Sequence, residues 1–242
     1  MNKITFVCCY NDKASYDTLC RTIKEQSAAS TIIGIDNTSQ KFTSCSSALN
    51  SVIDSIDTEF VAFVHQDIEF IRSDTVEKML SCAFAHNKND LFGVAGALET
   101  QDRSLKVITN VLHGKDSAPA GKSFSGIKEC QTLDECLVWG YTSYFKENRF
   151  EEELCDDWHL YFAEQCLRTR TKDGKVYVCD IDVIHRSNGT ISKAYAKGFY
   201  RLCRKYRKDF KTIATCCVVS SPRWPGVWLS YLFLYWTAGK NN

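Results

Sequence analysis

Residues 59–70 read EFVAFVHQDIEF. The apolar run from Phe60 to Val64 is short, continuous and rich in β-branched and aromatic residues, which predicts a buried β-strand. The run stops abruptly at three polar residues, His65, Gln66 and Asp67. Turn residues commonly close strands, but a turn does not require a histidine, an amide and a carboxylate in succession. This ending therefore favours a ligand site at the carboxyl end of the strand.

Two earlier stretches have the same apolar character, ITFVCC at 4–9 and STIIGIDN at 30–37. Between the strands, residues 14–26 and 46–56 carry apolar side chains at helical spacing. Strand, helix, strand, helix, strand with short links is typical of a parallel sheet covered on both faces. We therefore predict an α/β fold with a mostly parallel central sheet and helices on both faces.

Polar residues also close the two earlier strands, Asn11-Asp12 after the first and Asp36-Asn37 at the end of the second. In open α/β sheets, ligands bind beyond the carboxyl ends of the strands. We therefore expect these residues to lie with His65 and Asp67 at one edge. The alternative is that they only close turns, which suits the two asparagines well.

Asp67 is a candidate metal ligand, because hard cations such as Mg²⁺ and Mn²⁺ bind carboxylates together with substrate phosphates. His65 lies two residues earlier, on the same side of an extended chain. His185 ends the run DIDVIH and offers a nitrogen ligand, which Mn²⁺ tolerates better than Mg²⁺. Each histidine taken alone is more often a structural residue.

The remainder of the chain has a looser pattern, with a long excursion at 99–128 that we interpret as a hairpin over the site. The expected elements are a helix at 75–86, a strand at 91–98, a strand in ECLVWGYTSYF, a helix in LCDDWHLYFAEQCLRTRTKDG ending at Gly174, a strand pair or bent strand at 175–189, and a basic helix at 192–211.

The composition is that of an ordinary globular protein of 242 residues, enough for one large α/β domain or two small ones. The formal net charge of +1 gives no general field for nucleic acid, so we predict no such partner. The 13 cysteines are scattered and form no Cys-x-x-Cys pair, which favours reduced thiols in the cytoplasm. The apolar run near the start of the chain is too short for the core of a signal peptide. No stretch reaches the roughly 20 apolar residues of a spanning helix.

The segment CDDWHLYFAEQCLRTR is the densest in ionisable groups. On a helix, Asp157, Tyr161, Glu164 and Arg168 share one face through steps of three and four. Acidic residues near a helix start are also explained by the helix dipole alone. The functional interpretation is that one of these carboxylates is a general base.

The order and spacing of several stretches resemble the family 2 glycosyltransferases with the GT-A fold, in particular a bacterial glycosyltransferase-like subgroup with a His-Gln-Asp metal motif. These stretches are ITFVCCYND, IIGIDNTS, SSALNSVIDSIDTEFVAFVHQDIEF, LDECLVWG and FEEELCDDWHLYFAEQCLRTRTKDGKVYVCDIDVIHRSNG. The resemblance covers residues 4 to about 190 and implies a GT-A domain at 1–190 followed by a C-terminal extension at 191–242.

The resemblance implies a role for individual residues. The nucleotide and donor would be met by Asn11, Asp36, Asn50, His65 and Gln66, and the metal by Asp67 and His185. The implied cofactor is Mn²⁺ or Mg²⁺, and the implied donor is a nucleoside-diphosphate sugar, with a UDP-sugar first. His65 takes the place of a carboxylate in the usual Asp-x-Asp motif, which changes how ribose and metal are held.

The catalytic base is the least direct transfer, because the usual base positions fall on Tyr161 and Phe162. We expect Asp157 as the base ahead of Glu164, with His159 as a third candidate. The family implies an inverting, single-displacement transfer to a glycan or lipid-linked acceptor. The alternative is a non-catalytic nucleotide-sugar-binding module. A dinucleotide-binding oxidoreductase is disfavoured, because no Gly-x-Gly-x-x-Gly follows the first strand.

The C-terminal part combines a basic run at 193–211 with the aromatic segment WPGVWLSYLFLYW. A basic helix followed by Trp and Tyr is typical of a peripheral protein at an anionic membrane surface, here the inner face. The alternative is a solvated helix face, with the final segment packed on the domain or across a homodimer.

Overall fold

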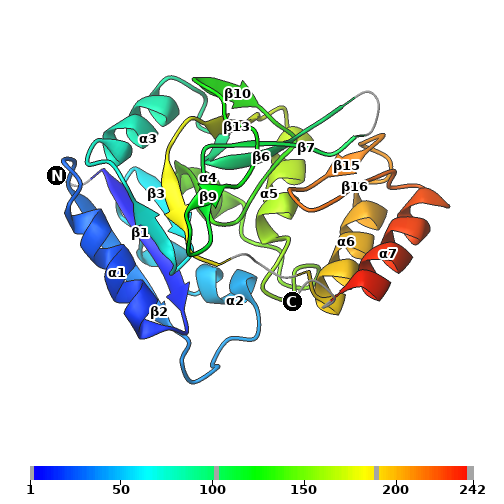
Figure 1. The fold of residues 1–242 in the computed structure, drawn as a ribbon, viewed down its shortest axis with the longest axis horizontal. Coiled ribbons are helices and arrows are strands. Elements are labelled where there is room, and N and C mark those ends of the chain that lie inside the picture. Colours follow the sequence, from blue (N-terminus) through cyan, green and yellow to red (C-terminus); the bar gives the residue numbers. More distant parts are fainter. Residues whose placement is uncertain (1–2, 101–103, 188–190, 239–242) are drawn as a thin grey trace.

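The computed structural model of the chain describes residues 3–100, 104–187 and 191–238, and its centre is a mixed β-sheet (Figure 1). The strand order is β10-β13-β5-β12-β3-β1-β2. The bounds are β1 Ile4–Tyr10, β2 Ser30–Asp36, β3 Phe60–Val64, β5 Leu91–Gly93, β10 Ile127–Glu129, β12 Leu137–Tyr141 and β13 Val176–Cys179. The predicted α/β class and the three N-terminal strands are confirmed.

The sheet is mixed rather than mostly parallel. β1 pairs in parallel with β2 and β3, as expected for strands joined by helical crossovers. β12, however, lies antiparallel between β3 and β5, because the chain enters it only after the excursion that follows β5. β10 is also antiparallel to its neighbour β13.

Both faces of the sheet are buried, which explains the continuous apolar runs. Phe6 and Phe60 contribute to a core on one face, whereas Val7 and Phe63 contribute to a second core on the other face. Period-two alternation along each strand separates the two sets. The helices that cover the sheet are α1 Lys13–Lys24, α2 Cys45–Asn50, α3 Thr75–Phe84, α4 Thr142–Glu147 and α5 Tyr161–Arg170.

Several predicted elements are broken by the tertiary structure. The helix expected at 46–56 is α2 followed by a 3-10 turn, η1 Ile53–Ser55. The strand expected at 91–98 breaks at Val94, and β6 Ala95–Leu98 joins a second sheet with β7 Lys106–Thr109 and β11 Thr132–Leu133. Within the excursion at 99–128, where a hairpin was expected, β8 Leu112–His113 and β9 Ala118–Pro119 pair antiparallel; residues 101–103 lie outside the described part.

The helix expected from Leu154 begins only at Tyr161. Leu160 has a left-handed backbone with φ of 70°, which ends any helical path from the preceding loop. Its buried side chain belongs to the core formed with the C-terminal helices, and its Cδ1 lies close to Gly198. Tertiary packing therefore leaves Asp157 and His159 in a loop rather than on a helix.

A small sheet forms beside the end of β3, in the order β4-β14-β8-β9. Its strands are β4 Ile68–Phe70, β8 Leu112–His113, β9 Ala118–Pro119 and β14 Val183–His185. β14 pairs with β4 on one side and with β8 on the other. This sheet brings His185 next to the His65–Asp67 turn.

The C-terminal part packs on the same body, at the end of the molecule opposite α1 (Figure 1). It comprises α6 Lys193–Lys205, β15 Ile213–Ala214, β16 Val219–Ser220 and α7 Gly226–Thr237, with α7 outermost. Gln131 donates to the carbonyl of Thr212 and accepts from the amide of Ala214. The predicted domain boundary at residue 190 stays a prediction.

Candidate active site

The carboxyl ends of β2, β1 and β3 meet at one edge, as expected from their parallel pairing. The Gln66 side chain connects two of them: its Oε1 accepts from the amides of Asn11 and Asp12 at 2.8 and 2.9 Å. Its Nε2 donates to Asn11 Oδ1 at 2.8 Å. Gln66 thereby fixes the loop after β1 against the turn after β3.

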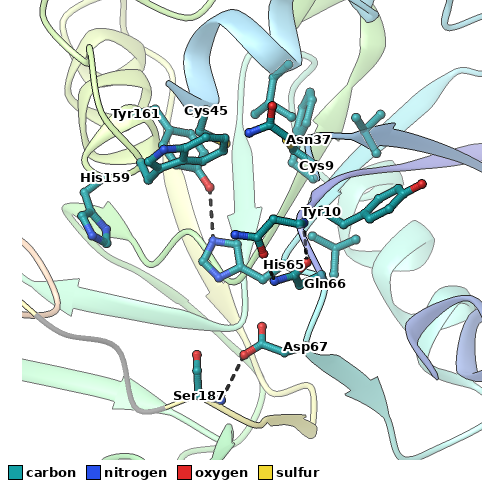
Figure 2. Close-up of a pocket in the computed structure, with 16 residues that line it drawn as sticks. Cys9, Tyr10, Asn37, Cys45, His65, Gln66, Asp67, His159, Tyr161 and Ser187 are labelled. Atoms are coloured by element: carbon teal, nitrogen blue, oxygen red, sulfur yellow. Dashed lines mark hydrogen bonds between the residues drawn. The ribbon is translucent and has the colours of Figure 1, made fainter. Parts of the chain in front are cut away.

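A cavity of about 360 Å³ opens at this edge, which lies within the usual range for small-molecule sites (Figure 2). Its walls come from the strand ends, the turn after β3 and the loop before α5. The polar and aromatic residues that line it include Tyr10, Asn11, Asn37, His65, Gln66, Asp67, Trp158, His159, Tyr161 and Ser187.

His65, Asp67 and His185 form a candidate metal-ligand set at the edge of this cavity. One ligand atom from each lies within 4.8 Å of the others. His185 Nε2 is 3.4 Å from Asp67 Oδ1, and the amide of Ser187 donates to Asp67 Oδ2 at 3.0 Å. Two nitrogens and a carboxylate oxygen suit Mn²⁺ better than Mg²⁺.

Each member of this set is oriented by a second contact. His65 Nε2 lies 3.2 Å from the Tyr161 hydroxyl, as drawn in Figure 2. His185 Nδ1 lies 3.2 Å from His113 Nε2, which comes from β8. Holding one ring nitrogen fixes the orientation of the other, which is how second contacts commonly orient metal-binding histidines.

The pKa values in this set favour a neutral His65 and an ionised Asp67. Burial, with the neighbouring His185, lowers the pKa of His65 from 6.5 to about 4. Burial alone would raise the pKa of Asp67, but the hydrogen bonds from His185 and Ser187 lower it well below its usual value. Burial likewise opposes the charge on His185, yet Asp67 raises its pKa above the usual value. A neutral imidazole and a carboxylate are the forms that bind a cation.

A second ionisable pair lies where the loop before α5 lines the cavity. His159 lines the cavity, and its Nδ1 is 3.8 Å from Glu135 Oε2. Burial raises the pKa of Glu135, whereas Glu135 raises the pKa of His159 against the effect of burial. Sequence reasoning gave no role to Glu135, although the adjacent carboxylates in LDECLVWG were a signal for it. Ser187 and His113 were missed because their partners are remote in sequence.

Three other predicted residues lie away from the cavity lining. Asp36 is exposed and its Oδ1 accepts from the amide and hydroxyl of Thr38, which lower its pKa. Asn50 bonds both the carbonyl and the amide of Phe150. Asp157 is half-buried, and its carbonyl accepts from the amide of Cys45 at 3.2 Å.

Glu164 has the least suitable environment for a base. Its side chain is fully buried, and its oxygens contact Lys205 Nζ, Arg168 and the Tyr206 hydroxyl, each at 2.8 Å. Glu164 and Arg168 share a helix face, as predicted, and they form an ion pair. These contacts connect α5 to α6 and leave no oxygen of Glu164 facing the cavity, so the structure argues against Glu164 as the base.

The comparisons with known proteins agree with this geometry. A family model described as "Glycosyltransferase like family" matches residues 5–209. No curated protein matches the chain significantly.

Similar solved structures include S. aureus TarS, at 13% identity and a TM-score of 0.57, covering 86% of this chain and 66% of that one. A Pyrobaculum calidifontis mannosyltransferase, PcManGT in complex with GDP-Man and Mn²⁺, has 12% identity and a TM-score of 0.55 over 96% of this chain and 69% of its own. GalNAc-T7, with UDP, GalNAc and Mn²⁺, has 10% identity and a TM-score of 0.59 over 86% and 51%. The chain thus spans between half and about two thirds of these proteins.

At such low identity these structures support the fold, and the predicted GT-A architecture is confirmed. The family match covers most of the sequence and includes both walls of the cavity. The chain therefore belongs to the glycosyltransferase-like family, among the family 2-like glycosyltransferases with the GT-A fold.

Proposed function

We propose that this protein is a metal-dependent, inverting glycosyltransferase that moves a sugar from a nucleoside-diphosphate sugar to a hydroxyl of a glycan or lipid-linked acceptor. The observation that carries the proposal is the His65, Asp67 and His185 set at the carboxyl edge of the sheet, of which His65 and Asp67 line a cavity of small-molecule size. Nucleotide-sugar complexes among the similar structures support the same donor class.

The residues present fit a divalent cation. Asp67 would hold it through a carboxylate oxygen, and His65 and His185 through imidazole nitrogens. When bound, the cation supplies positive charge that offsets the charge developing on the diphosphate leaving group. His113 and Ser187 keep His185 and Asp67 oriented for this role.

The donor nucleotide would lie along the strand ends. Tyr10, Asn11, Asn37 and Gln66 line this part of the cavity, and Asp36 precedes Asn37 at the end of β2. We propose a UDP-sugar, as in the TarS complex with UDP-GlcNAc and the GalNAc-T7 complex with UDP. Asn50 supports the loop at Phe150 instead of meeting the donor directly.

His159 is the base that the geometry favours, ahead of Asp157. The acceptor oxygen would attack the anomeric carbon while the bond from that carbon to the diphosphate oxygen breaks, its electron pair leaving with the diphosphate. The hydroxyl proton would pass to His159 Nε2, because Nδ1 faces Glu135. Glu135 would then stabilise the imidazolium, as the carboxylate does in a catalytic triad. Attack opposite the leaving group gives inversion.

The test is the melting temperature of the full chain with UDP, GDP or CDP, each with and without Mn²⁺. A ligand that binds only the native state raises the melting temperature, so UDP with Mn²⁺ should raise it more than UDP or Mn²⁺ alone. The extra increase should disappear in Asp67→Asn. An increase with UDP that ignores both Mn²⁺ and this substitution would overturn the metal assignment.

Transfer or donor hydrolysis over a panel of nucleotide sugars separates the enzyme from the alternative binding module. The module is favoured by the absence of a carboxylate at Tyr161 and Phe162, the positions where the family's base usually lies. Donor binding without transfer or hydrolysis under any acceptor condition would support the module. A cytoplasmic location and assembly as a homodimer also remain proposals.

A further inference from the structure

Helix α7 presents an apolar face to solvent. The preceding Trp224 is 79% exposed, and along the helix Trp228 is 44%, Leu229 61%, Phe233 66% and Trp236 69% exposed. Other exposed large apolar residues lie on separate elements, and scattered residues of that kind need no explanation. Five together on one short segment form a patch, which we call the α7 face.

The opposite side of α7 is packed against the rest of the protein. Val227 and Leu234 are buried in the core shared with α6 and α5. Tyr231 packs against Tyr200 of α6 with ring centroids 5.5 Å apart. Residues 226–237 contain no charged side chain. The helix is therefore anchored along one side, and its outer side is apolar without a polar stripe.

Cations border the α7 face at both ends. Lys193 Nζ lies 5.0 Å above the ring of Tyr235, near the end of the helix. Arg223 precedes its start, and its Nε donates to the carbonyl of Arg207 at 3.4 Å. Arg207 and Lys208 follow α6 and are exposed.

These cations lack acidic partners, in contrast with others on α6. Arg201 pairs with Asp156, and Lys205 pairs with Glu151 and Glu164. Within residues 3–100, 104–187 and 191–238, no ion pair is formed by the remaining basic residues here, which are Lys193, Lys197, Arg204, Arg207, Lys208, Lys211 and Arg223. Arg201 and Lys205 are therefore neutralised by acidic side chains, whereas the other cations, with Asp209 as the one acidic residue within 193–211, leave a local excess of positive charge on a chain of net charge +1.

We infer that the α7 face docks on an anionic membrane surface, with the helix in the plane of the interface. Tryptophan favours this interface because its ring is apolar and its N–H remains near water. Anionic head groups would neutralise the bordering cations. A second copy would cover the tryptophans but bring the same cations against each other, which disfavours it.

The length of α7 agrees with docking rather than crossing. Its 12 residues extend about 18 Å at 1.5 Å per residue, against about 30 Å for the hydrocarbon core. Among the described residues, no helix has both the length and the apolarity needed to span a membrane. This inference does not depend on the proposed catalysis, because it concerns a separate surface.

The test is flotation of the full chain with vesicles of phosphatidylcholine alone and of an equimolar mixture with phosphatidylglycerol. We expect flotation with the anionic vesicles, weakened by added salt. Brominated lipids should quench part of the tryptophan fluorescence, from the α7 face and not from the buried Trp139. No flotation of the folded wild-type chain would overturn the inference.

Two matched pairs of variants test the two contributions. Leu229→Gln/Phe233→Gln/Trp236→Gln should lower binding by at least about tenfold, whereas the control Ile71→Gln/Leu105→Gln/Ile127→Gln, at exposed sites elsewhere, should not. Arg207→Gln/Lys208→Gln/Arg223→Gln should lower it by about tenfold or more. Its control, Lys24→Gln/Lys41→Gln/Lys146→Gln, removes the same charge from other exposed sites.

Light scattering in the absence of lipid tests the alternative, which is that a second copy of the chain covers the α7 face. A monomeric wild-type chain that floats supports the membrane. A dimer that the Leu229→Gln/Phe233→Gln/Trp236→Gln variant converts to monomer would assign the α7 face to a second copy and overturn the inference.

Discussion

Asp67 and Glu164 are both carboxylates shielded from solvent, and they differ in what surrounds them. The Asp67 side chain is 17% exposed, lines the cavity and has a histidine and a backbone amide as partners. The Glu164 side chain is 0% exposed and is held by Lys205, Arg168 and Tyr206. Asp67 therefore keeps contact with the cavity, whereas Glu164 is fully occupied by the protein itself.

This difference separates a binding role from a structural one. A histidine partner can release its proton and bind a cation, so Asp67 can share His185 with a metal ion. Lysine and arginine partners are permanently charged and balance Glu164 without any ligand. The same side-chain chemistry thus serves function at the edge of the sheet and stability between α5 and α6.

The largest effect is expected at Asp67. Asp67→Asn keeps the size of the side chain but removes the charge that would hold the cation, so transfer should fall by about a thousandfold or more. Because His185 and Ser187 lower the pKa of Asp67 in the folded protein, the substitution should also lower the melting temperature without ligand, so transfer is measured below that temperature. The control is Glu69→Gln, which breaks the nearby ion pair with Arg186 and should retain activity. Wild-type turnover in Asp67→Asn would contradict the proposal that sugar transfer takes place in this cavity.

The pair of His159 and Glu135 gives the next test. His159→Ala should lower kcat by about 10²- to 10⁴-fold, the usual contribution of a general base. Glu135→Gln should also shift the pH profile. Glu135 raises the pKa of His159, so its loss lowers that pKa, and the acidic limb of kcat/KM should move to lower pH because the base acts in its neutral form.

Asp157→Asn is the matched comparison for His159→Ala, because Asp157 lies in the same loop. Full activity would leave His159 as the base. A loss in Asp157→Asn larger than in His159→Ala, with an unshifted profile in Glu135→Gln, would return that role to Asp157.

Glu164 should respond in stability and not in catalysis. Glu164→Gln leaves Arg168 and Lys205 without their common carboxylate, which should lower the free energy of unfolding by about 2–3 kcal/mol. The kcat of the folded protein should be unchanged. Asp156→Asn, which breaks an exposed pair with Arg201, should cost less than about 1 kcal/mol in the same denaturation experiment. Loss of kcat in a stably folded Glu164→Gln protein would show that Glu164, like Asp67, contributes to catalysis.

The smallest effect is expected at Asn50. Asn50→Ala removes the bonds to the backbone of Phe150 and should cost about 1–2 kcal/mol of stability. Its affinity for UDP, measured by calorimetry, should be unchanged. Gln66→Ala should show the reverse pattern, because Gln66 holds Asn11 and Asp12 at the cavity. Weaker UDP binding in Asn50→Ala at constant stability would restore Asn50 as a donor residue.

The sequence predicted the N-terminal half of the fold well. The three apolar runs that became β1, β2 and β3 are unambiguous because both faces of this sheet are buried. Their parallel pairing then followed from the intervening helices, and with it the convergence of Asn11, Gln66 and Asp67. The periodicity of apolar residues and the length of the connections are local properties, so they can be recognised in the sequence alone.

The site was predicted only in part, since a residue's role depends on partners that are distant along the chain. The sequence suggested the ligand set of His65, Asp67 and His185, but not the contact of His185 with His113, 72 residues away. It also gave no indication that Lys205 would neutralise Glu164 across 41 residues.

Local sequence thus determined the strands, their order at the N-terminal edge and the polar residues at their ends, because burial on two faces requires apolar runs. Only the tertiary structure decided which carboxylate faces the cavity and which is enclosed. Leu160 shows the reason: its left-handed backbone and its packing on α6 hold His159 in a loop beside the cavity and start α5 in time to bury Glu164. That outcome is set by contacts with residues some 40 positions later, which no local pattern encodes.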